Sequence, residues 1–406
     1  MNAPLYLDHA ATTPPLPAAI EAFLKAQREA FANPSSLHQA GAEAARCLER
    51  ARNELRTALG ASRYRVIWTG TGTESNHLGI LGLAPRLKSK VRREARRLGR
   101  EQPRILVGNL EHPSAGMAAQ SLQEEGFVVQ TVAANREGRI LPERLAESLA
   151  ADVALVCIQW ANNELGSLQP IPALVALTRK LAPKAAFHVD AVQAAGKLSQ
   201  DVDALAADSV AVAAHKLGGV RGCAALLLHE EAPEPRPLFH GGGHEGGLRS
   251  GTENTAGAAA FAAAAVERRL RLAEDPERYH KRRQALLDGL TQAQVEAHPL
   301  GPADPEQFLP SILSVALPGM PAETLLHRLE AQGYWVGSGS ACHAGGHKES
   351  AILTAIDCPR AWRNAVLRFS FDGSEDLAAL GELGSVIAGI FAEQGGQTAD
   401  SSSPSS

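Results

Sequence analysis

The chain carries the stretch Phe187-His188-Val189-Asp190-Ala191-Val192-Gln193 and, further on, the stretch Ser209-Val210-Ala211-Val212-Ala213-Ala214-His215-Lys216. Each begins as an apolar run of strand length and ends in polar residues, with Asp190 in the first and Lys216 in the second. Ligands of an open parallel sheet bind at the edge where the strands end. Isolated Asp and Lys side chains are rarely buried, so two of them at the ends of neighbouring strands indicate a functional site.

This pair of charged residues has two interpretations. Pyridoxal phosphate requires a Lys amine for a Schiff base and an Asp that keeps the pyridine nitrogen protonated. A structural ion pair at the sheet edge is the alternative. Taken alone, Asp190 and Lys216 favour neither interpretation.

The composition is that of a globular protein with two core-forming domains. The 406 residues exceed the usual size of one domain, and a net charge of −4 is too small to indicate nucleic acid or a membrane surface as a partner. The start, Met1-Asn2-Ala3-Pro4, lacks the basic residues of a signal peptide, and no apolar run reaches the length of a membrane span. Scattered cysteines, odd in number, fit a reducing cytoplasm, so we expect a cytoplasmic enzyme. They are Cys47, Cys157, Cys223, Cys342 and Cys358.

Strand-like and helix-like segments alternate between residues 60 and 230, which predicts an α/β fold with a mainly parallel, doubly wound sheet of seven strands. The predicted strands are Arg65–Trp68, Ile105–Gly108, Val128–Ala133, Val153–Gln159, Phe187–Asp190, Val210–Ala213 and Cys223–Leu228. An Ala-rich helix over Ala256–Leu272 leads into a smaller α+β domain. We place the large domain at 16–260, the small domain at 1–15 and 261–393, and a disordered tail rich in Gly, Ser and Pro at 394–406.

Several segments near the predicted strand ends offer further binding groups. The loop Thr69-Gly70-Thr71-Gly72-Thr73-Glu74-Ser75 joins a strand to a helix start, which favours a single phosphate over a dinucleotide because the third glycine of the dinucleotide fingerprint is Ser75. His112 could stack on a flat cofactor or simply cap a helix. Gln193 could reach a ring oxygen, and Asn162-Asn163-Glu164 offers amide groups at the same edge. The basic segment 86–104 is best interpreted as a solvated helix face, with an interaction surface as the alternative.

These motifs, taken in order over about residues 5–392, resemble those of the cysteine desulfurases, a branch of the fold-type I, class V aminotransferase-like pyridoxal phosphate enzymes. Each motif alone is unspecific, whereas the ordered set is very specific. The set is Tyr6-Leu7-Asp8-His9-Ala10-Ala11-Thr12-Thr13-Pro14, Asn33-Pro34-Ser35-Ser36, Gly72-Thr73-Glu74-Ser75-Asn76, Glu111-His112, Asn162-Asn163-Glu164, His188-Val189-Asp190-Ala191, His215-Lys216, Gly241-Gly242-Gly243, Arg249-Ser250-Gly251-Thr252, Gly339-Ser340-Ala341-Cys342 and Arg368-Phe369-Ser370.

The resemblance implies pyridoxal 5'-phosphate as the cofactor and a role for each matching residue. Lys216 would form the Schiff base and move the Cα proton, while Asp190 would pair with the pyridine nitrogen. Gln193 would contact the ring oxygen, and His112 would stack on the ring and serve as an acid–base group. Phosphate contacts are implied for Gly72, Thr73, His215 and, from the second subunit of a homodimer, Thr252.

The same resemblance implies the reaction. Asn163 and Arg368 would hold the carboxylate of L-cysteine, Arg368 through a bidentate fork. The Cys342 thiolate would attack the substrate sulfur, leaving alanine and a persulfide that passes to a sulfur-acceptor protein, as in iron–sulfur cluster biogenesis. A metal site of Cys342, His343 and His347 is the alternative for this loop, and we expect no metal because no fourth ligand is evident.

Departures from the family pattern keep other functions open. The Ser that often precedes the Schiff-base Lys by three residues is Ala213 here, and the segment after Lys216 reads Gly218-Gly219-Val220-Arg221-Gly222. The His343-Ala344-Gly345-Gly346-His347 loop after Cys342 lacks the common Ser and Thr residues. Cys342-His343 with Gly251-Thr252-Glu253 also resembles selenocysteine lyases, so selenocysteine is a possible substrate. The alternatives are a selenocysteine lyase or other C–S lyase, and a non-catalytic binding module.

Overall fold

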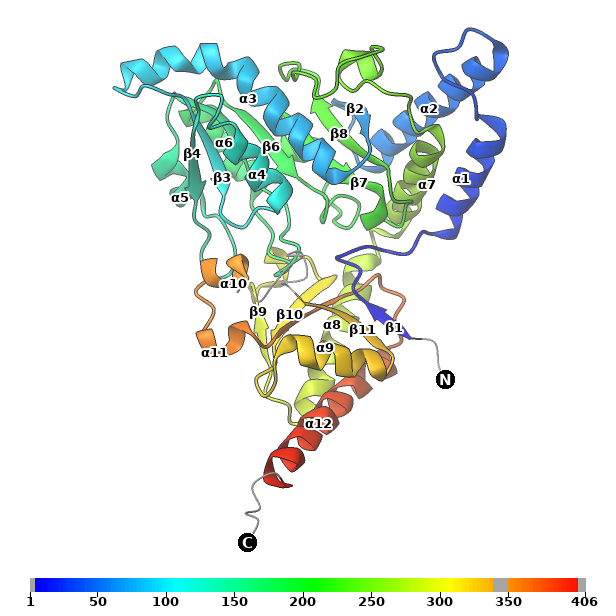
Figure 1. Cartoon of the computed structure of the whole chain (residues 1–406), viewed down its shortest axis with the longest axis vertical. Helices are drawn as coiled ribbons and strands as arrows, with labels where there is room; N and C mark the ends of the chain where they lie inside the picture. Colours follow the sequence, from blue (N-terminus) through cyan, green and yellow to red (C-terminus); the bar gives the residue numbers. More distant parts are fainter. Residues whose placement is uncertain (1–3, 339–349, 401–406) are drawn as a thin grey trace.

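The computed structural model describes residues 4–338 and 350–400, which form two lobes, each built on one β-sheet (Figure 1). The larger sheet has seven strands in the order β2-β8-β7-β6-β5-β3-β4. Their bounds are β2 (Tyr64–Thr69), β3 (Arg104–Gly108), β4 (Val128–Val132), β5 (Val153–Cys157), β6 (Ala186–Asp190), β7 (Ser209–Ala213) and β8 (Ala224–His229). β8 runs opposite in direction to the other strands of this sheet, so the predicted mainly parallel, seven-stranded sheet is confirmed.

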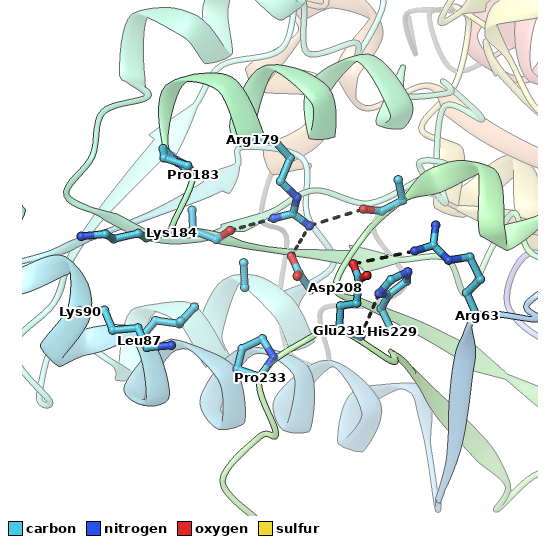
Figure 2. Close-up of a pocket in the computed structure, with 13 residues that line it drawn as sticks. Arg63, Leu87, Lys90, Arg179, Pro183, Lys184, Asp208, His229, Glu231 and Pro233 are labelled. Carbon is cyan, nitrogen blue, oxygen red and sulfur yellow. Dashed lines mark hydrogen bonds and ion pairs between the residues drawn. The ribbon is translucent and has the colours of Figure 1, made fainter.

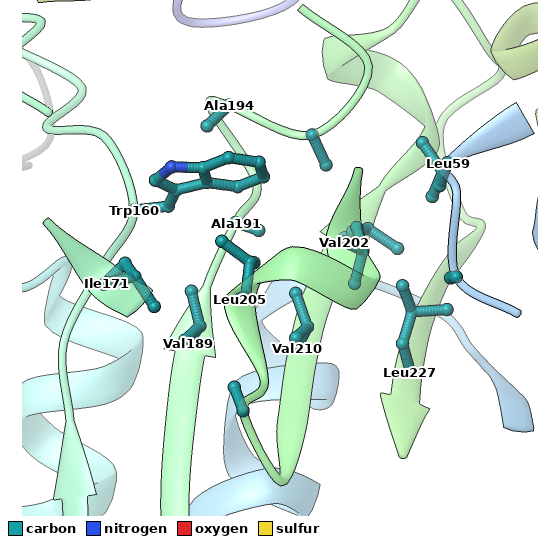
Figure 3. Close-up of a cluster of buried hydrophobic side chains, with 14 of the residues drawn as sticks. Leu59, Trp160, Ile171, Val189, Ala191, Ala194, Val202, Leu205, Val210 and Leu227 are labelled. Atoms are coloured by element: carbon teal, nitrogen blue, oxygen red, sulfur yellow. The ribbon is translucent and has the colours of Figure 1, made fainter. Parts of the chain in front are cut away.

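The central strands are apolar because both faces of the sheet are covered. β5, β6 and β7 are buried along their whole length, as parallel strands between two helix layers must be. One layer contains α3 (Gly72–Arg97) and α4 (Pro113–Ser121). The other contains α1 (Pro17–Glu29), α2 (Gln39–Ala58), α5 (Pro142–Ser148), α6 (Ile171–Leu181) and α7 (Thr255–Arg271). Figure 3 shows part of the core on this second side, where Val189 and Val210 of adjacent strands lie near Trp160 and Leu205.

The smaller sheet has the order β1-β11-β12-β10-β9, in which β1 is parallel to β11 and the other pairs are antiparallel. Its strands are β1 (Leu5–Leu7), β9 (His298–Leu300), β10 (Ile312–Ala316), β11 (Tyr334–Ser338) and β12 (Val366–Ser370). The helices of this lobe are α8 (Asp275–Gln292), α9 (Ala322–Ala331), α10 (Ala351–Ala355), α11 (Arg360–Arg363) and α12 (Leu377–Asp400). Short 3-10 turns complete the two lobes: η1 (Val202–Leu205), η2 (Ala214–Lys216), η3 (Glu245–Gly247) and η4 (Pro305–Gln307).

Two features differ from the domain and tail boundaries predicted from the sequence. Phe261 of α7 lies in the core of the large lobe, just past residue 260, and the domain limits themselves stay a prediction. The backbone of α12 is helical as far as Asp400, inside the segment predicted to be disordered. Helix propagation explains this extension, because each added residue gains one backbone hydrogen bond once the helix exists.

The N-terminal segment connects the two lobes at the edge of the large sheet. Ala10 donates its backbone N–H to the Ser370 hydroxyl of the small lobe at 2.8 Å. Three residues later, Thr13 donates its N–H to the His215 carbonyl of the large lobe at 2.9 Å. The segment therefore holds β12 of the small sheet against the carboxyl end of β7. No helix in the described part of the chain has the length and apolar character needed to cross a membrane.

Candidate active site

The residues singled out in the large lobe meet at the carboxyl edge of the seven-stranded sheet. Asp190 is the last residue of β6, and Lys216 ends the η2 turn that follows β7 directly. His112 is the N-cap residue of α4, and Thr73 lies in the first turn of α3. The parallel register, in which Asp190 pairs with Ala211 of β7, brings the two strand ends together.

Asp190 is 7% exposed and both of its carboxylate oxygens accept hydrogen bonds. Asn76 of α3 donates from Nδ2 to Oδ2 at 2.7 Å, and the Val192 amide donates to Oδ1 at 3.0 Å. Because a carboxylate only accepts, the Asn76 amide must present its oxygen to the other side, where it lies 3.1 Å from His188 Nε2.

The His188 ring is thereby fixed as the neutral Nε2–H tautomer, since Asn76 Oδ1 can only accept. Its Nδ1 lies 2.8 Å from the Ser209 hydroxyl, and complete burial lowers the His188 pKa to about 3. Gly79 of α3 leaves room for this ring, because a Cβ there would overlap Nδ1. A buried chain of neutral groups thus orients the Asp190 carboxylate from behind.

His112 joins the same network through Ser114. Its Nδ1 accepts from the Ser114 amide at 3.2 Å and lies 2.8 Å from the Ser114 hydroxyl, which in turn accepts from Asn76 Nδ2 at 2.9 Å. Burial lowers the His112 pKa, the nearby Asp190 charge opposes this shift, and the Lys216 charge adds to it. The helix-capping interpretation of His112 is therefore correct, and this contact still leaves Nε2 available for other partners.

The Lys216 ammonium contacts the N-terminal segment. Nζ donates to the carbonyls of Ala10 at 2.6 Å and Ala11 at 2.8 Å. Gln193 Nε2 donates to the same Ala10 carbonyl at 2.9 Å, while its Oε1 is buried and has no hydrogen-bond partner among the described residues. The backbone of residues 10–11 therefore forms one wall of the site.

The predicted phosphate end is built on the first turn of α3, where backbone N–H groups lack acceptors within the helix. Gly72 packs closely there, since a Cβ would lie 3.0 Å from the Val192 side chain and 3.5 Å from the Ala213 Cβ. His215 Nδ1 lies 3.1 Å from the Thr12 hydroxyl, and burial together with the Lys216 charge lowers the His215 pKa to about 4. Thr252 is exposed on the loop before α7, and no hydrogen bond within the described ranges joins it to these groups.

The small lobe contributes a cationic group beside this edge. Arg368 of β12 is 4% exposed, and its Nη1 donates to the Asn163 carbonyl at 3.1 Å. Its Nη2 donates to Asp8 Oδ1 at 2.7 Å, while Nε is buried with no partner among residues 4–338 and 350–400. The neighbouring Glu164 accepts from the Ser350 hydroxyl at 3.0 Å, and burial raises its pKa to about 7. The structure thus brings Arg368 to the backbone of Asn163, and the carboxylate subsite itself stays a prediction.

Cys342, His343 and His347 lie outside the described residues. The predicted nucleophile and its alternative as a metal ligand therefore stay predictions.

Comparison with known proteins agrees with this geometry. The family model for class-V aminotransferases matches residues 5–377. A cysteine desulfurase IscS of Dictyoglomus turgidum is 32% identical over 93% of this chain and 92% of its own length. An IscS-like cysteine desulfurase of Mycobacterium tuberculosis is 37% identical over 90% of each chain. The chain belongs to the cysteine desulfurase family.

Solved structures give the same result for the fold of this cysteine desulfurase family member. A NifS-like protein superposes with a TM-score of 0.83 at 29% identity, covering 96% of this chain and 99% of that one. SspA in complex with cysteine superposes with a TM-score of 0.75 at 27% identity, covering 92% and 100%. The fold-type I architecture of the pyridoxal phosphate enzymes is therefore established for this chain. Members of the family are enzymes, and so is this one.

Sequence reasoning assigned no role to three residues that organise the desulfurase site. Asn76 and Asp8 belong to the family motifs, but nothing in their spacing indicates the distant groups that they contact. Ser114 had no signal beyond its place after His112 and Pro113. Each forms side-chain contacts with residues brought close only by the fold.

A separate pocket of about 510 Å³ lies at the opposite edge of the large sheet (Figure 2). Its charged groups are largely paired, with Arg179 2.7 Å from Asp208 and Arg63 3.8 Å from Glu231. Asp208 precedes β7 directly, whereas the site residues follow the other end of this strand. The pocket is therefore not part of the candidate active site.

Proposed function

We propose that this protein is a pyridoxal phosphate-dependent cysteine desulfurase that converts L-cysteine to L-alanine and leaves the sulfur on Cys342 as a persulfide. The observation that carries this proposal is the continuous chain of contacts from the large lobe to the small one. Lys216 contacts the Ala10 carbonyl, the Ala10 amide contacts Ser370, and Ser370 lies two residues from Arg368 on β12. The Lys216 amine and the cation that we propose for carboxylate binding are thus linked through the backbone of Ala10.

The residues at the sheet edge fit pyridoxal phosphate by their chemistry. The Asp190 carboxylate is suited to a protonated pyridine nitrogen. Gln193 Oε1 has no hydrogen-bond partner in the described part of the chain, so this buried acceptor can take a donor from a bound group. The first turn of α3, with Gly72 and Thr73, is suited to the phosphate together with His215. When bound, the cofactor supplies an electron sink that acidifies the substrate Cα–H.

We assign the proton transfer and the substrate binding to separate side chains of this protein. Lys216 would carry a proton at Cα, and the Ala10 and Ala11 carbonyls would hold its ammonium form in place. Arg368 and Asn163 would bind the substrate carboxylate. His112, held neutral by burial, would stack beside the ring and exchange protons through Nε2.

The sulfur step needs a thiolate at Cys342, which we propose as the nucleophile. It would attack the sulfur of L-cysteine so that an S–S bond forms as the Cβ–S bond breaks, and Cβ then takes up a proton. The net change is L-cysteine plus the Cys342 thiol to L-alanine plus the Cys342 persulfide, which balances without an external oxidant. A sulfur-acceptor protein would regenerate the thiol.

We further propose a homodimer in the cytoplasm. Phe31 and Leu37, in the connection between α1 and α2, are 73% and 103% exposed, and a second subunit would cover these apolar side chains. Thr252 of the partner subunit would complete the phosphate-binding site. Its hydroxyl would replace the one that is absent at Ala213. The described cysteines are free thiols, in keeping with a reducing compartment.

Product analysis with wild-type protein, Lys216→Ala and Cys342→Ala tests this function. Wild-type protein with added pyridoxal phosphate should absorb visible light, and with L-cysteine it should release equal amounts of alanine and transferable sulfur. Lys216→Ala should lose the absorbance and the activity, whereas Cys342→Ala should keep the absorbance and lose persulfide formation. Sulfide release by Cys342→Ala at the wild-type rate would contradict the persulfide step, and turnover of selenocysteine alone would make the protein a selenocysteine lyase. Light scattering in solution tests the homodimer.

A further inference from the structure

Three adjacent strands of the small sheet place Asp8, Gly337 and Arg368 side by side. β1, β11 and β12 are neighbours in that order, and the register pairs Leu7 with Val336 and Gly337 with Arg368. Asp8 follows β1 directly and forms an isolated parallel bridge with Ser370 of β12. The Asp8 carboxylate therefore reaches across the position of Gly337 to Arg368 Nη2, at 2.7 Å.

This contact exists only because position 337 has no side chain. A Cβ there would lie 2.5 Å from Asp8 Oδ1 and 2.9 Å from Arg368 Nη2, too close for either atom to stay. The backbone of Gly337 does not have the positive φ that favours glycine. Close approach of the two charged side chains is thus the physical reason for a glycine at this strand position.

The contact also decides which N–H groups of Arg368 remain for a ligand. Asp8 accepts one N–H of Nη2 and the Asn163 carbonyl accepts one N–H of Nη1, so both ends of the guanidinium are anchored while each Nη keeps a second N–H. Nε is buried and has no acceptor within the described part of the chain. A buried donor without an acceptor is unfavourable, and a carboxylate ligand would satisfy it.

Burial makes the pairing asymmetric. The Arg368 side chain is 5% exposed, whereas the Asp8 side chain is 25% exposed and partly solvated. Asp8 balances the guanidinium charge before any substrate arrives, so net charge alone cannot drive carboxylate binding there. Recognition of a carboxylate must then depend on where the free N–H groups of Arg368 lie.

We propose that Asp8 is a positioning residue for the substrate carboxylate: across Gly337 it fixes the Arg368 guanidinium so that the Nε–H is available to the carboxylate. Gly337 is a specificity-determining residue in the same sense, because any side chain there separates Asp8 from Arg368. This inference rests on the proposed function only in taking Arg368 as the residue that binds the amino-acid carboxylate.

Two ligands that differ only in a carboxylate test the proposal. L-alanine and ethylamine share an amine and a methyl group, and only L-alanine has the carboxylate. Their affinities for the pyridoxal phosphate-loaded protein are measured by titration of the cofactor absorbance in the wild type, Asp8→Asn and Gly337→Ala. Both variants should bind L-alanine about tenfold more weakly and ethylamine unchanged. With L-cysteine, KM should rise by a similar factor while kcat stays within about twofold.

The double variant and a matched control separate positioning from stability. The double variant Asp8→Asn with Gly337→Ala should bind L-alanine no more weakly than the single variant with the lower affinity. The two changes are not additive because both act through Arg368. Asp152→Asn breaks another buried Arg–Asp pair, in which Asp152 Oδ2 lies 2.7 Å from Arg104 Nε. It should lower thermal stability and leave both affinities unchanged.

Equal losses for L-alanine and ethylamine, or unchanged L-alanine binding in Asp8→Asn and Gly337→Ala, would overturn the proposal. If one of the two variants fails to fold, the affinities of the other variant for L-alanine and ethylamine decide the test. The ligand titration needs no turnover, so a wild-type protein that binds L-alanine but does not desulfurate cysteine would contradict the proposed function and still test Asp8.

Discussion

Asn76 of α3 and Asp190 of β6 are joined by a 2.7 Å hydrogen bond at the carboxyl edge of the large sheet. The same Asn76 amide contacts His188 and Ser114, so one side chain links the strand, the helix and the His112 loop. Asn76, Asp190, His188 and Ser114 are buried, so Asp190 Oδ2 and His188 Nε2 lose a hydrogen bond that water does not readily replace if Asn76 is removed.

Replacing Asn76 by Ala should therefore weaken both the fold and cofactor binding. Asp190 loses a hydrogen bond and His188 Nε2 is left without an acceptor, which should cost about 1–3 kcal/mol of unfolding free energy. We expect the Kd for pyridoxal phosphate, measured by absorbance titration, to rise about tenfold. The exposed Asn53, whose Oδ1 lies 3.3 Å from Arg56 Nη2, supplies the control. Asn53→Ala should match the wild type, and wild-type affinity in Asn76→Ala would contradict the proposed role.

Gly79→Ala should destabilise the protein although alanine favours a helix. The new methyl group would overlap His188 Nδ1 and displace the ring from Asn76 and Ser209. We expect a loss of about 1–3 kcal/mol in chemical unfolding. Gly116 of α4 has open space at its Cβ position, so Gly116→Ala should instead stabilise by about 0.5–1 kcal/mol. If both substitutions stabilised the protein equally, the close contact of Gly79 with His188 would be wrong.

Glu164→Gln should flatten the pH dependence of stability. Burial raises the pKa of the Glu164 carboxyl from 4.5 to about 7, and the Ser350 hydroxyl and the Arg368 charge act in the opposite direction. The folded state therefore holds this proton more tightly than the unfolded state. Its stabilising effect is fully present below about pH 4.5 and is lost as the pH rises through about 7, a difference of up to about 3 kcal/mol.

Urea unfolding at pH 5 and pH 8 measures this effect. Glu164→Gln should be more stable than the wild type at pH 8 and about equal to it at pH 5. Glu49, with a side chain 61% exposed, gives the control substitution Glu49→Gln, which should keep the wild-type difference between the two pH values. An unchanged difference in Glu164→Gln would show that another group titrates in this range.

Ala213→Ser tests the departure from the family pattern at the phosphate end. Ala213 is 2% exposed, and its Cβ would lie 3.5 Å from a Cβ at Gly72, so a hydroxyl there would lie near the first turn of α3. We expect pyridoxal phosphate to bind about three- to tenfold more tightly, since one hydrogen bond to a charged phosphate is added. Pyridoxal without the phosphate should bind equally to both proteins. Equal gains for the two ligands would place the phosphate elsewhere.

Local patterns in the sequence were enough to predict the large sheet. The runs at Phe187–Asp190 and Val210–Ala213 are apolar because both faces of these strands are covered, and burial of this kind is visible in the sequence itself. The end of α3 was harder to predict. Pro85 normally ends or bends a helix, yet α3 continues through it to Arg97, because packing of Leu87, Val91 and Ala95 in the core supports the second half.

The sequence by itself placed charged groups at the strand ends, since Asp190 follows Val189 directly and only His215 separates Lys216 from the apolar run that ends at Ala214. Only the tertiary structure decided which distant groups hold them. Asp8 and Arg368 meet because β1, β11 and β12 are adjacent, and this pairing depends on sheet order and register. Lys216 and Ala10 meet because the N-terminal segment crosses between the lobes at the carboxyl end of β7. Hydrophobic periodicity reports burial along one segment, whereas contacts between segments are set by how the sheets pair and pack.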